Sequence, residues 1–312
     1  MNTNEIPYLK PGDTIALAAP ARAVSANEML PAITMMRSWG LDVLVPEGLY
    51  EREGQLAGTD AHRAALMQSL LDDSAVKAII CCRGGYGTVR IIDRLDFSRF
   101  AKTPKWIIGY SDITVLHSHI HRTLGLPTIH ATMPINFPAD MQPNAATESL
   151  RRILFGERLN IEWQTGEQEV ACSPQQDLDI GNTSIVGGNL SILYSLLGSK
   201  SQIDTRGKVL LIEDLDEYLY HIDRMMNALK RAGMLDGLAA LMVGGMNDMH
   251  DNSTPWGKTA SETILDVTSD CGYPIIFGAP FGHTPCSNIA VPLGMPVKIV
   301  TADLKKISIF AP

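Results

Sequence analysis

A serine at the junction between an apolar strand and a helix is the first candidate for chemistry in this sequence. Ser111 follows the apolar run Trp106–Gly109 and precedes a helical pattern that begins at Ile113. A serine at such a turn is lifted out of its sheet, and backbone N–H groups at the helix start can stabilise an oxyanion. Ile113 stands where a nucleophile elbow has its second glycine, and serine is also a favoured helix N-cap. Both interpretations, nucleophile and simple cap, stay open from this segment alone.

A glycine-rich loop lies one strand–helix unit earlier in the chain. Residues 82–88 (CRGGYGT) follow an apolar run and carry Gly84, Gly85 and Gly87, so the backbone can approach a ligand closely. A dinucleotide fingerprint is incomplete because Arg90 occupies the place of its third glycine, and the P-loop pattern is absent. The loop is suited to donate N–H groups to an anion, although an ordinary strand–helix turn explains it equally well.

Two further ionisable candidates lie in the second half of the chain. Glu213 ends the apolar run Val209–Ile212, and strand alternation turns its side chain toward the buried face. A carboxylate there needs a partner, and an imidazole N–H would serve. His283 lies in the loop 281–288 (FGHTPCSN), which glycine and proline interrupt between two apolar runs. The alternatives are a solvated strand end for the glutamate and a structural role for the histidine.

The histidines that follow Ser111 allow a metal site as a competing interpretation. His117 and His121 are four residues apart and therefore share one face of the expected helix. The glutamate of the H-E-x-x-H pattern is missing, and His130 is the one further ligand that suggests itself. We expect no metal and no cofactor, and we keep a metal-dependent hydrolase as an alternative.

The elements that must position these residues alternate between strand and helix in the first half. Repeated units of this kind, with strongly apolar strands, predict a parallel sheet covered by helices. The expected strands are Thr14–Ala18, Leu41–Val45, Val76–Cys82, Trp106–Gly109 and Thr128–His130. The expected helices are Ser25–Trp39, one that starts at Thr59-Asp60, Tyr86–Leu95 and Ile113–Leu124.

The pattern changes in the polar stretch 164–182, which we predict to be a linker between two domains. The N-terminal α/β domain then covers 1–163, and a C-terminal β-rich domain covers 183–312. Expected elements of the second domain are helices at 189–197 and 218–231 and strands at 208–212, 238–243 and 275–277. Three short apolar runs close the chain, with turns between them, and predict an antiparallel sheet: 288–292, 297–300 and 306–310.

Composition and charge exclude several classes of partner. The 312 residues carry a formal net charge of −8, and the sequence has no basic stripe of the kind that binds nucleic acid. No apolar run approaches the ~20 residues that a membrane helix needs. The N-terminal residues lack the basic and then apolar pattern of a secretory signal, so we expect a cytoplasmic protein.

Taken together, four segments resemble the LD-carboxypeptidase family of serine peptidases, which also contains the microcin C immunity peptidases. The segments are GYSD, RGGYG, LIED and GHTPCSN, and the likeness covers essentially the whole chain. The resemblance implies a Rossmann-like N-terminal α/β domain, a C-terminal β-rich domain and a homodimer. It further implies that Ser111 is the nucleophile, His283 the general base and Glu213 the group that orients the histidine.

The same resemblance implies a substrate, the murein tetrapeptide, from which terminal D-alanine is released during cell-wall recycling. The bond cut would join D-alanine to the L-configured centre of a diamino acid. From general triad logic, we expect the N–H of Asp112 and one from Gly84 or Gly85 to hold the oxyanion. The free carboxylate of the substrate needs a cation, for which Arg83 is the nearest candidate by sequence, and Tyr86 is expected beside it.

The microcin C-type activity is the alternative within the family. Such a substrate carries a nucleotide-like group, which needs an aromatic surface. Trp256 is the candidate for that surface, and packing of its own loop is the simpler role for it.

Overall fold

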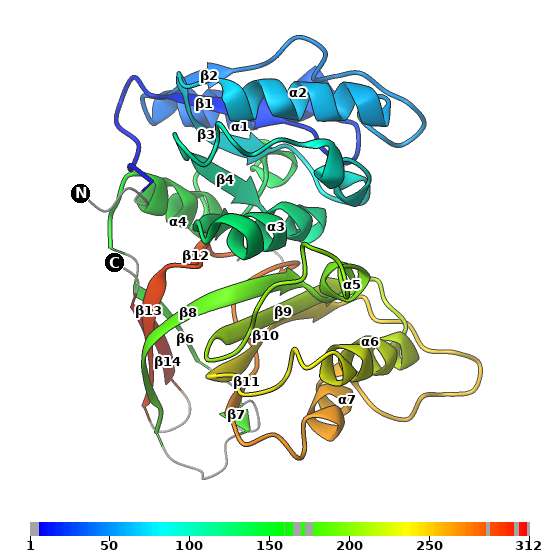
Figure 1. Ribbon diagram of the computed structural model, residues 1–312. Coiled ribbons are helices and arrows are strands. Elements are labelled where there is room, and N and C mark those ends of the chain that lie inside the picture. The colour runs from blue at the N-terminus through cyan, green and yellow to red at the C-terminus, as the bar shows by residue number, and fades with distance from the viewer. Residues whose placement is uncertain are drawn as a thin grey trace.

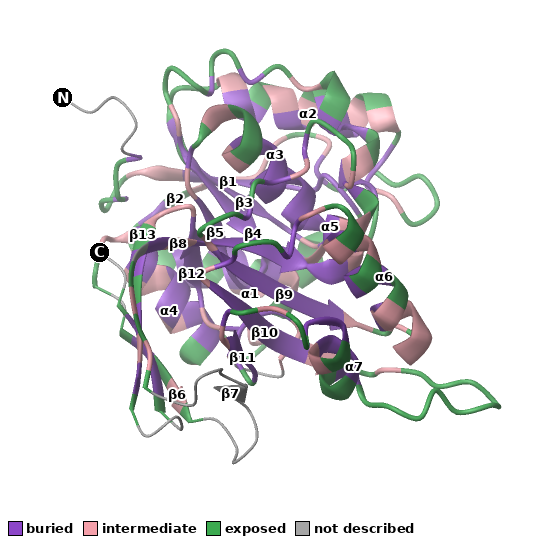
Figure 2. Cartoon of the chain, turned by 60° about the horizontal axis from the view of Figure 1, so that its bottom comes forward, coloured by how far each residue is buried: buried purple, intermediate pink, exposed green. Residues whose placement is uncertain are grey.

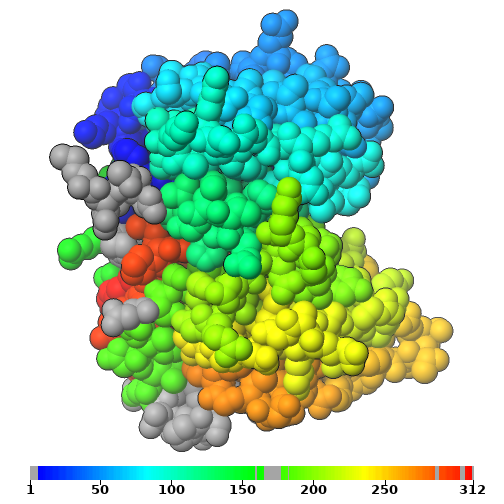
Figure 3. Space-filling view, in the orientation of Figure 1, coloured from blue at the N-terminus to red at the C-terminus, as the bar shows by residue number. Residues whose placement is uncertain are grey.

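The computed structural model describes residues 6–158, 160–164, 170–171, 177–284, 288–302 and 306–310. The described chain forms two β-sheets with helices packed on them, one sheet mainly from each half of the sequence (Figure 1). In the space-filling view the blue-to-cyan N-terminal part lies above the yellow and orange C-terminal part (Figure 3). The fold class expected from the sequence, α/β with a β-rich second part, is confirmed.

The first sheet has six strands in the order β12-β5-β4-β3-β1-β2. All neighbouring pairs are parallel except that β12 runs antiparallel to β5. The strands are β1 (Thr14–Ala18), β2 (Asp42–Leu44), β3 (Val76–Cys81), β4 (Trp106–Gly109), β5 (Thr128–His130) and β12 (Val291–Leu293). The parallel core of this sheet confirms the prediction from alternating strands and helices.

Helices cover both faces of the first sheet, because its apolar strands need burial on each side. Two helices pack on one face, α1 (Ala26–Ser38) and α4 (Ala145–Leu154), and two on the other, α2 (Asp60–Asp72) and α3 (Thr114–Leu124). Ser25 caps α1 with a capping box, and Thr59 caps α2, so both helices begin where the sequence predicts.

The second sheet has eight strands in the order β6-β14-β13-β8-β9-β10-β11-β7. Its centre, β8 to β11, is parallel, and the outer strands on both sides run antiparallel. The strands are β6 (Asn160–Gln164), β7 (Val170–Ala171), β8 (Asp179–Asn189), β9 (Val209–Leu215), β10 (Ala240–Asn247), β11 (Ile275–Ile276), β13 (Pro296–Ala302) and β14 (Lys306–Phe310).

One face of the second sheet packs on helices and the other on the first half of the molecule. The helices are α5 (Leu190–Ser195), α6 (Leu219–Arg231) and α7 (Ala260–Val267). On the opposite face, Ile185 and Leu211 share one apolar cluster with Ile108 of β4. The central strands β1, β3, β4, β9 and β10 are accordingly buried along most of their length (Figure 2). A shared core of this kind holds the two halves in a fixed relation.

Two expectations about local structure were wrong. The helix predicted over Tyr86–Leu95 is instead two short 3₁₀ turns, η1 (Thr88–Arg90) and η2 (Ile92–Arg94). The N–H of Thr88, which would enter a helix ladder, donates to Asp112 Oδ2 at 2.9 Å, and Gly87 has a positive φ of 137° that no helix accommodates. The run 288–292 was expected in the C-terminal sheet, but β12 returns to pair with β5 of the first sheet.

The predicted division into domains at 164–182 stays a prediction. Residues 165–169 and 172–176 lie outside the described residues, while Asp179 already belongs to β8 and 160–164 form β6 of the second sheet. Two further 3₁₀ turns complete the described elements, η3 (Ser111–Ile113) and η4 (Pro134–Asn136). Within the described residues, no helix combines the length and apolar character needed to cross a membrane.

Candidate active site

A pocket of about 550 Å³ lies where strand ends of the two sheets meet. Ser111 follows β4, the glycine loop follows β3, and Asn189 and Leu215 end β8 and β9. Ligand sites of open parallel sheets form outside the carboxyl ends of their strands. Here both sheets turn those ends toward the same pocket, which brings segments far apart in the sequence together.

Ser111 has a backbone conformation that non-glycine residues rarely adopt. Its φ is +62°, in the left-handed region, and it lies between β4 and the 3₁₀ turn that leads into α3. Strained residues of this type cluster at active sites, where the surrounding structure holds them. The helix α3 begins at Thr114 after Ile113, and no side chain caps it or the preceding turn. The capping interpretation of Ser111 is therefore wrong, and its hydroxyl makes no capping bond.

Glu213 and His283 form a close pair at the edge of the pocket. Glu213 Oε2 lies 2.6 Å from Nδ1 of the imidazole and 3.3 Å from the backbone nitrogen of His283. Glu213 has no exposed surface, so the alternation of β9 buries it as the sequence predicts. Because a carboxylate only accepts, Nδ1 carries the donated hydrogen and Nε2 is left as the free base of the neutral ring.

The charge of this pair determines how readily His283 takes a proton. Burial alone would lower the pKa of His283, but the hydrogen bond to Glu213 and the charges of Glu213 and Asp214 outweigh it and raise that pKa above its ordinary value. A more basic imidazole is a stronger proton acceptor.

The imidazole and the serine face one pocket. His283 packs on the ring of Tyr110, the residue before Ser111, with ring centroids 4.9 Å apart. Within the described residues, the Ser111 hydroxyl and the His283 ring are not joined by a hydrogen bond. Such bonds are often long without substrate and shorten when it binds.

The glycine loop lies directly against Ser111. A Cβ placed on Gly84 would lie 3.0 Å from Ser111 Oγ and 3.3 Å from the backbone nitrogen of Asp112. The N–H groups of Gly84 and Gly85 donate to no other group in the described parts of the chain. Side by side with Ser111, these N–H groups are where an oxyanion hole would form. Arg83 and the exposed Tyr86 line the same pocket.

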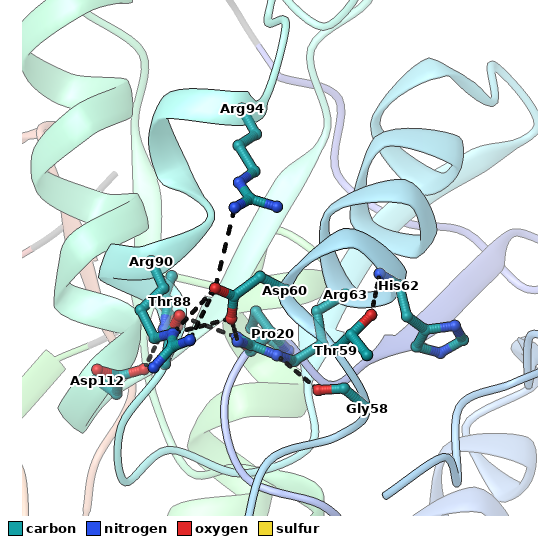
Figure 4. A network of polar contacts seen from close by, with 11 residues as sticks. Pro20, Gly58, Thr59, Asp60, His62, Arg63, Thr88, Arg90, Arg94 and Asp112 are labelled. Atoms are coloured by element: carbon teal, nitrogen blue, oxygen red, sulfur yellow. Dashed lines mark hydrogen bonds and ion pairs between the residues drawn. The ribbon is translucent and has the colours of Figure 1, made fainter. Parts of the chain in front are cut away.

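The buried guanidinium of Arg63 holds the glycine loop through hydrogen bonds (Figure 4). Arg63 of α2 donates to the carbonyls of Pro20 (2.5 Å) and Gly87 (2.9 Å) and contacts the carboxylate of Asp60. Its side chain has no exposed surface. Asp112 adds a second tie, because its buried carboxylate accepts the Thr88 N–H and burial raises its pKa. The segment after β1, the glycine loop and the turn of Ser111 are thus linked by polar contacts.

Comparison with known proteins assigns the family. Residues 15–131 match the LD-carboxypeptidase N-terminal domain, and residues 182–299 match the LD-carboxypeptidase C-terminal domain. A probable murein peptide carboxypeptidase of Bacillus subtilis is 38% identical over 302 residues, which are 95% of this chain and 91% of that protein. The chain belongs to the LD-carboxypeptidase family. It is therefore a member of a family of peptidases.

A further relative agrees with this assignment, and solved structures share the fold. A murein tetrapeptide carboxypeptidase of Pseudomonas aeruginosa is 29% identical over 244 residues, 75% of this chain and 76% of that protein. The solved muramoyltetrapeptide carboxypeptidase of Oxalobacter formigenes superposes with a TM-score of 0.84 at 24% identity, over 96% of this chain and 99% of that one. The microcin-related protein MccF, solved with glutamyl sulfamoyl guanosine, has the same fold, with a TM-score of 0.80, 22% identity and 98% of each chain covered.

The histidines proposed for a metal alternative lie on two elements, with His117 and His121 on α3 and His130 on β5. His117 donates from Nε2 to the carbonyl of Gly109 at 3.0 Å, and burial lowers its pKa to about 4. Burial, with the nearby charges of His117 and His283, lowers the pKa of His130 to about 3. His121 lies one turn after His117 on α3, beside Gly294. The described residues gather no group of three or more side chains able to hold a metal.

Sequence reasoning missed Asp214, which lies beside the pair, and Arg22, which lines the pocket. Asp214 is buried beside Glu213 and accepts hydrogen bonds at 2.9 Å from the Asn189 side chain and the Ser191 N–H. Burial and the charge of Glu213 raise the pKa of Asp214 to about 7. The second acid of the LIED segment was the available signal for it. Arg22 also lines the pocket, and no local pattern marks it.

Proposed function

We propose that this protein is a serine-type LD-carboxypeptidase that releases terminal D-alanine from murein tetrapeptide in cell-wall recycling. Ser111 is the nucleophile, His283 the general base and Glu213 the residue that orients the base. The observation that carries the proposal is the strained turn of Ser111, which shares one pocket with the 2.6 Å Glu213–His283 pair. The names of relatives from Bacillus subtilis and Pseudomonas aeruginosa support the substrate class.

The chemistry follows from these positions. Nε2 of His283 takes the hydroxyl proton of Ser111, whose oxygen bonds to the carbonyl carbon of the penultimate residue. The tetrahedral intermediate breaks its C–N bond as His283 returns the proton to the leaving amino group of D-alanine. A water molecule then gives a proton to His283 as its oxygen bonds to the acyl carbon. The bond from that carbon to Ser111 Oγ breaks as His283 returns the proton to Oγ, which frees the tripeptide and restores the hydroxyl. Glu213 holds the ring with its proton on Nδ1 throughout.

Backbone donors stabilise the charge that develops on the carbonyl oxygen. The N–H of Asp112 follows the nucleophile directly, and those of Gly84 and Gly85 belong to the loop packed against Ser111. One donor of this type contributes about 10²- to 10³-fold in rate. Arg83 and Tyr86, which line the pocket, are proposed to contact the substrate.

The cytoplasmic location stays a prediction, and the homodimer is a proposal that rests on the family resemblance. Fractionation of cells tests the location, and the mass of the purified protein in solution tests the dimer. We propose no nucleic-acid partner, because the net charge is −8 and the sequence has no basic stripe.

The microcin-type alternative receives less support from the pocket. Trp256, its aromatic candidate, donates from its indole N–H to Thr263 of α7 at 3.1 Å and does not line the pocket. The indole thus packs on its own region of the chain. The shared fold with MccF does not by itself distinguish the two substrates.

The test is to incubate the protein with murein tripeptide, tetrapeptide and pentapeptide and with an aminoacyl sulfamoyl nucleoside, and to identify products by mass spectrometry. We expect D-alanine from the tetrapeptide, unchanged by a chelator, and no release by Ser111→Ala. Ser195→Ala, an exposed serine on α5, serves as the matched control and should keep full activity. Near-normal turnover by Ser111→Ala would refute the serine mechanism, and cleavage of the nucleoside alone would favour the alternative.

A further inference from the structure

Arg22 is a second arginine of the catalytic pocket, and it lies on the glycine loop itself. A Cβ placed on Gly85 would meet the side chain of Arg22, with Nε at 3.0 Å, so the arginine packs over the glycine that follows Gly84. Gly85 has a φ of +102°. A side chain there would be both strained and displaced by the arginine. The cation therefore lies against Gly85, one of the two glycines whose N–H groups are proposed to hold the oxyanion.

The backbone of Arg22 is fixed by its neighbours. Arg22 forms a β-bridge with Leu56, and the flanking Ala23 N–H donates to the carbonyl of Gln55 at 3.0 Å. Pro20, two residues earlier, is held by the buried guanidinium of Arg63, which also binds Gly87 (Figure 4). The same side chain thus ties together the segment that carries Arg22 and the glycine loop.

The guanidinium of Arg22 has no acidic partner among the described residues. Nε and one terminal nitrogen donate to the neutral amide oxygen of Gln55, at 3.2 and 3.0 Å. Arg83, by comparison, has Glu28 within 3.8 Å. Across the pocket, Asp216 and Glu217 are each paired with a histidine, at 2.5 and 2.6 Å. Arg22 is thus the cation of the pocket whose charge is not already matched.

The geometry of the substrate brings its C-terminal carboxylate close to Arg22. In a carboxypeptidase substrate the C-terminal carboxylate follows the scissile carbonyl by only the nitrogen and the α-carbon of one residue. One residue spans at most about 3.6 Å, so a carbonyl oxygen held at the glycine loop puts that carboxylate within reach of the next cation. A guanidinium binds a carboxylate through two parallel hydrogen bonds, which fixes position as well as charge.

We infer that Arg22, held by Gln55 and packed on Gly85, binds the C-terminal carboxylate of the leaving residue and so restricts this enzyme to removal of a single terminal residue. The inference rests on the proposed function and adds the residue that recognises the chain end. It differs from the expectation that Arg83 has this role, and the two arginines are tested together.

The experiment compares two peptides with the protein and its variants. One is the tetrapeptide that ends in D-alanine, and the other is the same peptide ending in D-alaninamide, which lacks the negative charge. We expect wild type to prefer the acid in kcat/KM. Arg22→Gln should lower kcat/KM for the acid roughly 10- to 100-fold, mainly through KM, as expected for loss of a hydrogen bond to a charged group. The loss for the amide should be much smaller, so that the preference for the acid over the amide disappears.

Arg83→Gln tests the alternative that Arg83 binds the carboxylate. Arg231 is an exposed arginine at the end of α6, and Arg231→Gln removes the same charge away from the pocket. Both should retain the preference for the acid. Turnover of the amide by Arg22→Gln shows that the variant is folded. If that turnover is also lost, binding of acid and amide to the Ser111→Ala and Ser111→Ala/Arg22→Gln proteins gives the same comparison without catalysis. An undiminished acid preference in Arg22→Gln overturns the inference alone, whereas failure of wild type to release D-alanine from the tetrapeptide overturns the proposed function.

Discussion

The carboxylate of Glu213 lies 2.6 Å from Nδ1 of His283, although the two residues belong to different segments of the second half of the chain. The carboxylate is fully buried while the imidazole reaches the pocket. A buried acceptor of this kind determines both which ring nitrogen carries the proton and how basic the other one is.

Replacement of Glu213 by glutamine tests that relationship through the pH profile. The folded pKa of His283 is raised above 6.5, and the neutral ring is the base, so kcat/KM of wild type should rise with pH through a pKa above 6.5. Without the carboxylate charge, burial dominates and the rise should move to lower pH. We also expect kcat to fall about 10³- to 10⁴-fold, as for loss of the acid in other triads. An unchanged pKa with full activity would remove Glu213 from the mechanism.

The Glu213–His283 pair also makes the free energy of unfolding depend on pH, and this quantity should fall over the range in which kcat/KM rises. Because the folded pKa of His283 is raised, its contribution to stability is fully present below about pH 6.5 and is lost as pH rises through the folded pKa. The free energy of unfolding of wild type, relative to His283→Gln, should therefore decrease as pH is raised through that range. Denaturant titrations at several pH values measure this difference, and a difference that increases with pH would contradict the assignment.

Gly282 makes room for the Glu213 carboxylate. Its φ is +84°, and a Cβ there would lie 2.5 Å from Glu213 Oε2. Gly282→Ala should displace the carboxylate from His283 and lower kcat by at least about 10-fold, with the pH profile shifted as in the glutamine variant. Gly257→Ala is a matched control, because Gly257 also has a φ of +84° but would meet nothing within 4 Å. Equal losses in the two variants would mean that backbone strain, and not the contact, is responsible.

Gly84 leaves room for Ser111. Gly84→Ala places a Cβ 2.9 Å from Ser111 Cβ and should shift the loop, so its N–H groups no longer meet the oxyanion. The expected loss in kcat is about 10²- to 10³-fold, with little change in KM. Gly272→Ala, at a site with open space and no positive φ, should behave as wild type in steady-state kinetics. An increase in KM with kcat unchanged would instead assign Gly84 to substrate binding.

Replacement of Arg63 tests how much stability depends on its hydrogen bonds to the segments of Pro20 and Gly87. Arg63→Met would leave the buried carbonyls of Pro20 and Gly87 without this donor, whereas Asp60 would keep its hydrogen bonds to Arg90. We expect a loss of about 2 to 4 kcal/mol in unfolding free energy. Arg94→Ala removes an exposed arginine 4.0 Å from Asp60, and it should cost less than about 1 kcal/mol. Chemical denaturation distinguishes the two, and similar small changes in both would show that the network is not structural.

Much of the local structure could be predicted from the sequence. The bounds of β1 and β4, the start of the helix at Ser25 and the cap at Thr59 agree with expectation. Strand alternation, helical spacing and capping depend on residues a few positions apart. The face on which Glu213 lies could be predicted for the same reason. The failure at Tyr86–Leu95 marks a place where a long-range bond, from Thr88 to Asp112, replaced a helix hydrogen bond.

The sequence by itself determined the family resemblance, the α/β pattern and the residues able to do acyl-transfer chemistry. Only the tertiary structure decided that Glu213 meets His283, that Ser111 has a positive φ and caps nothing, and that Arg22 joins the pocket. The physical reason is range: periodicity fixes the face of an element, whereas the approach of two elements depends on the packing of both sheets on one core. Arg22 in particular lies in a loop, where no repeating pattern indicates a direction, and its place follows from the buried Arg63 that holds the loops together.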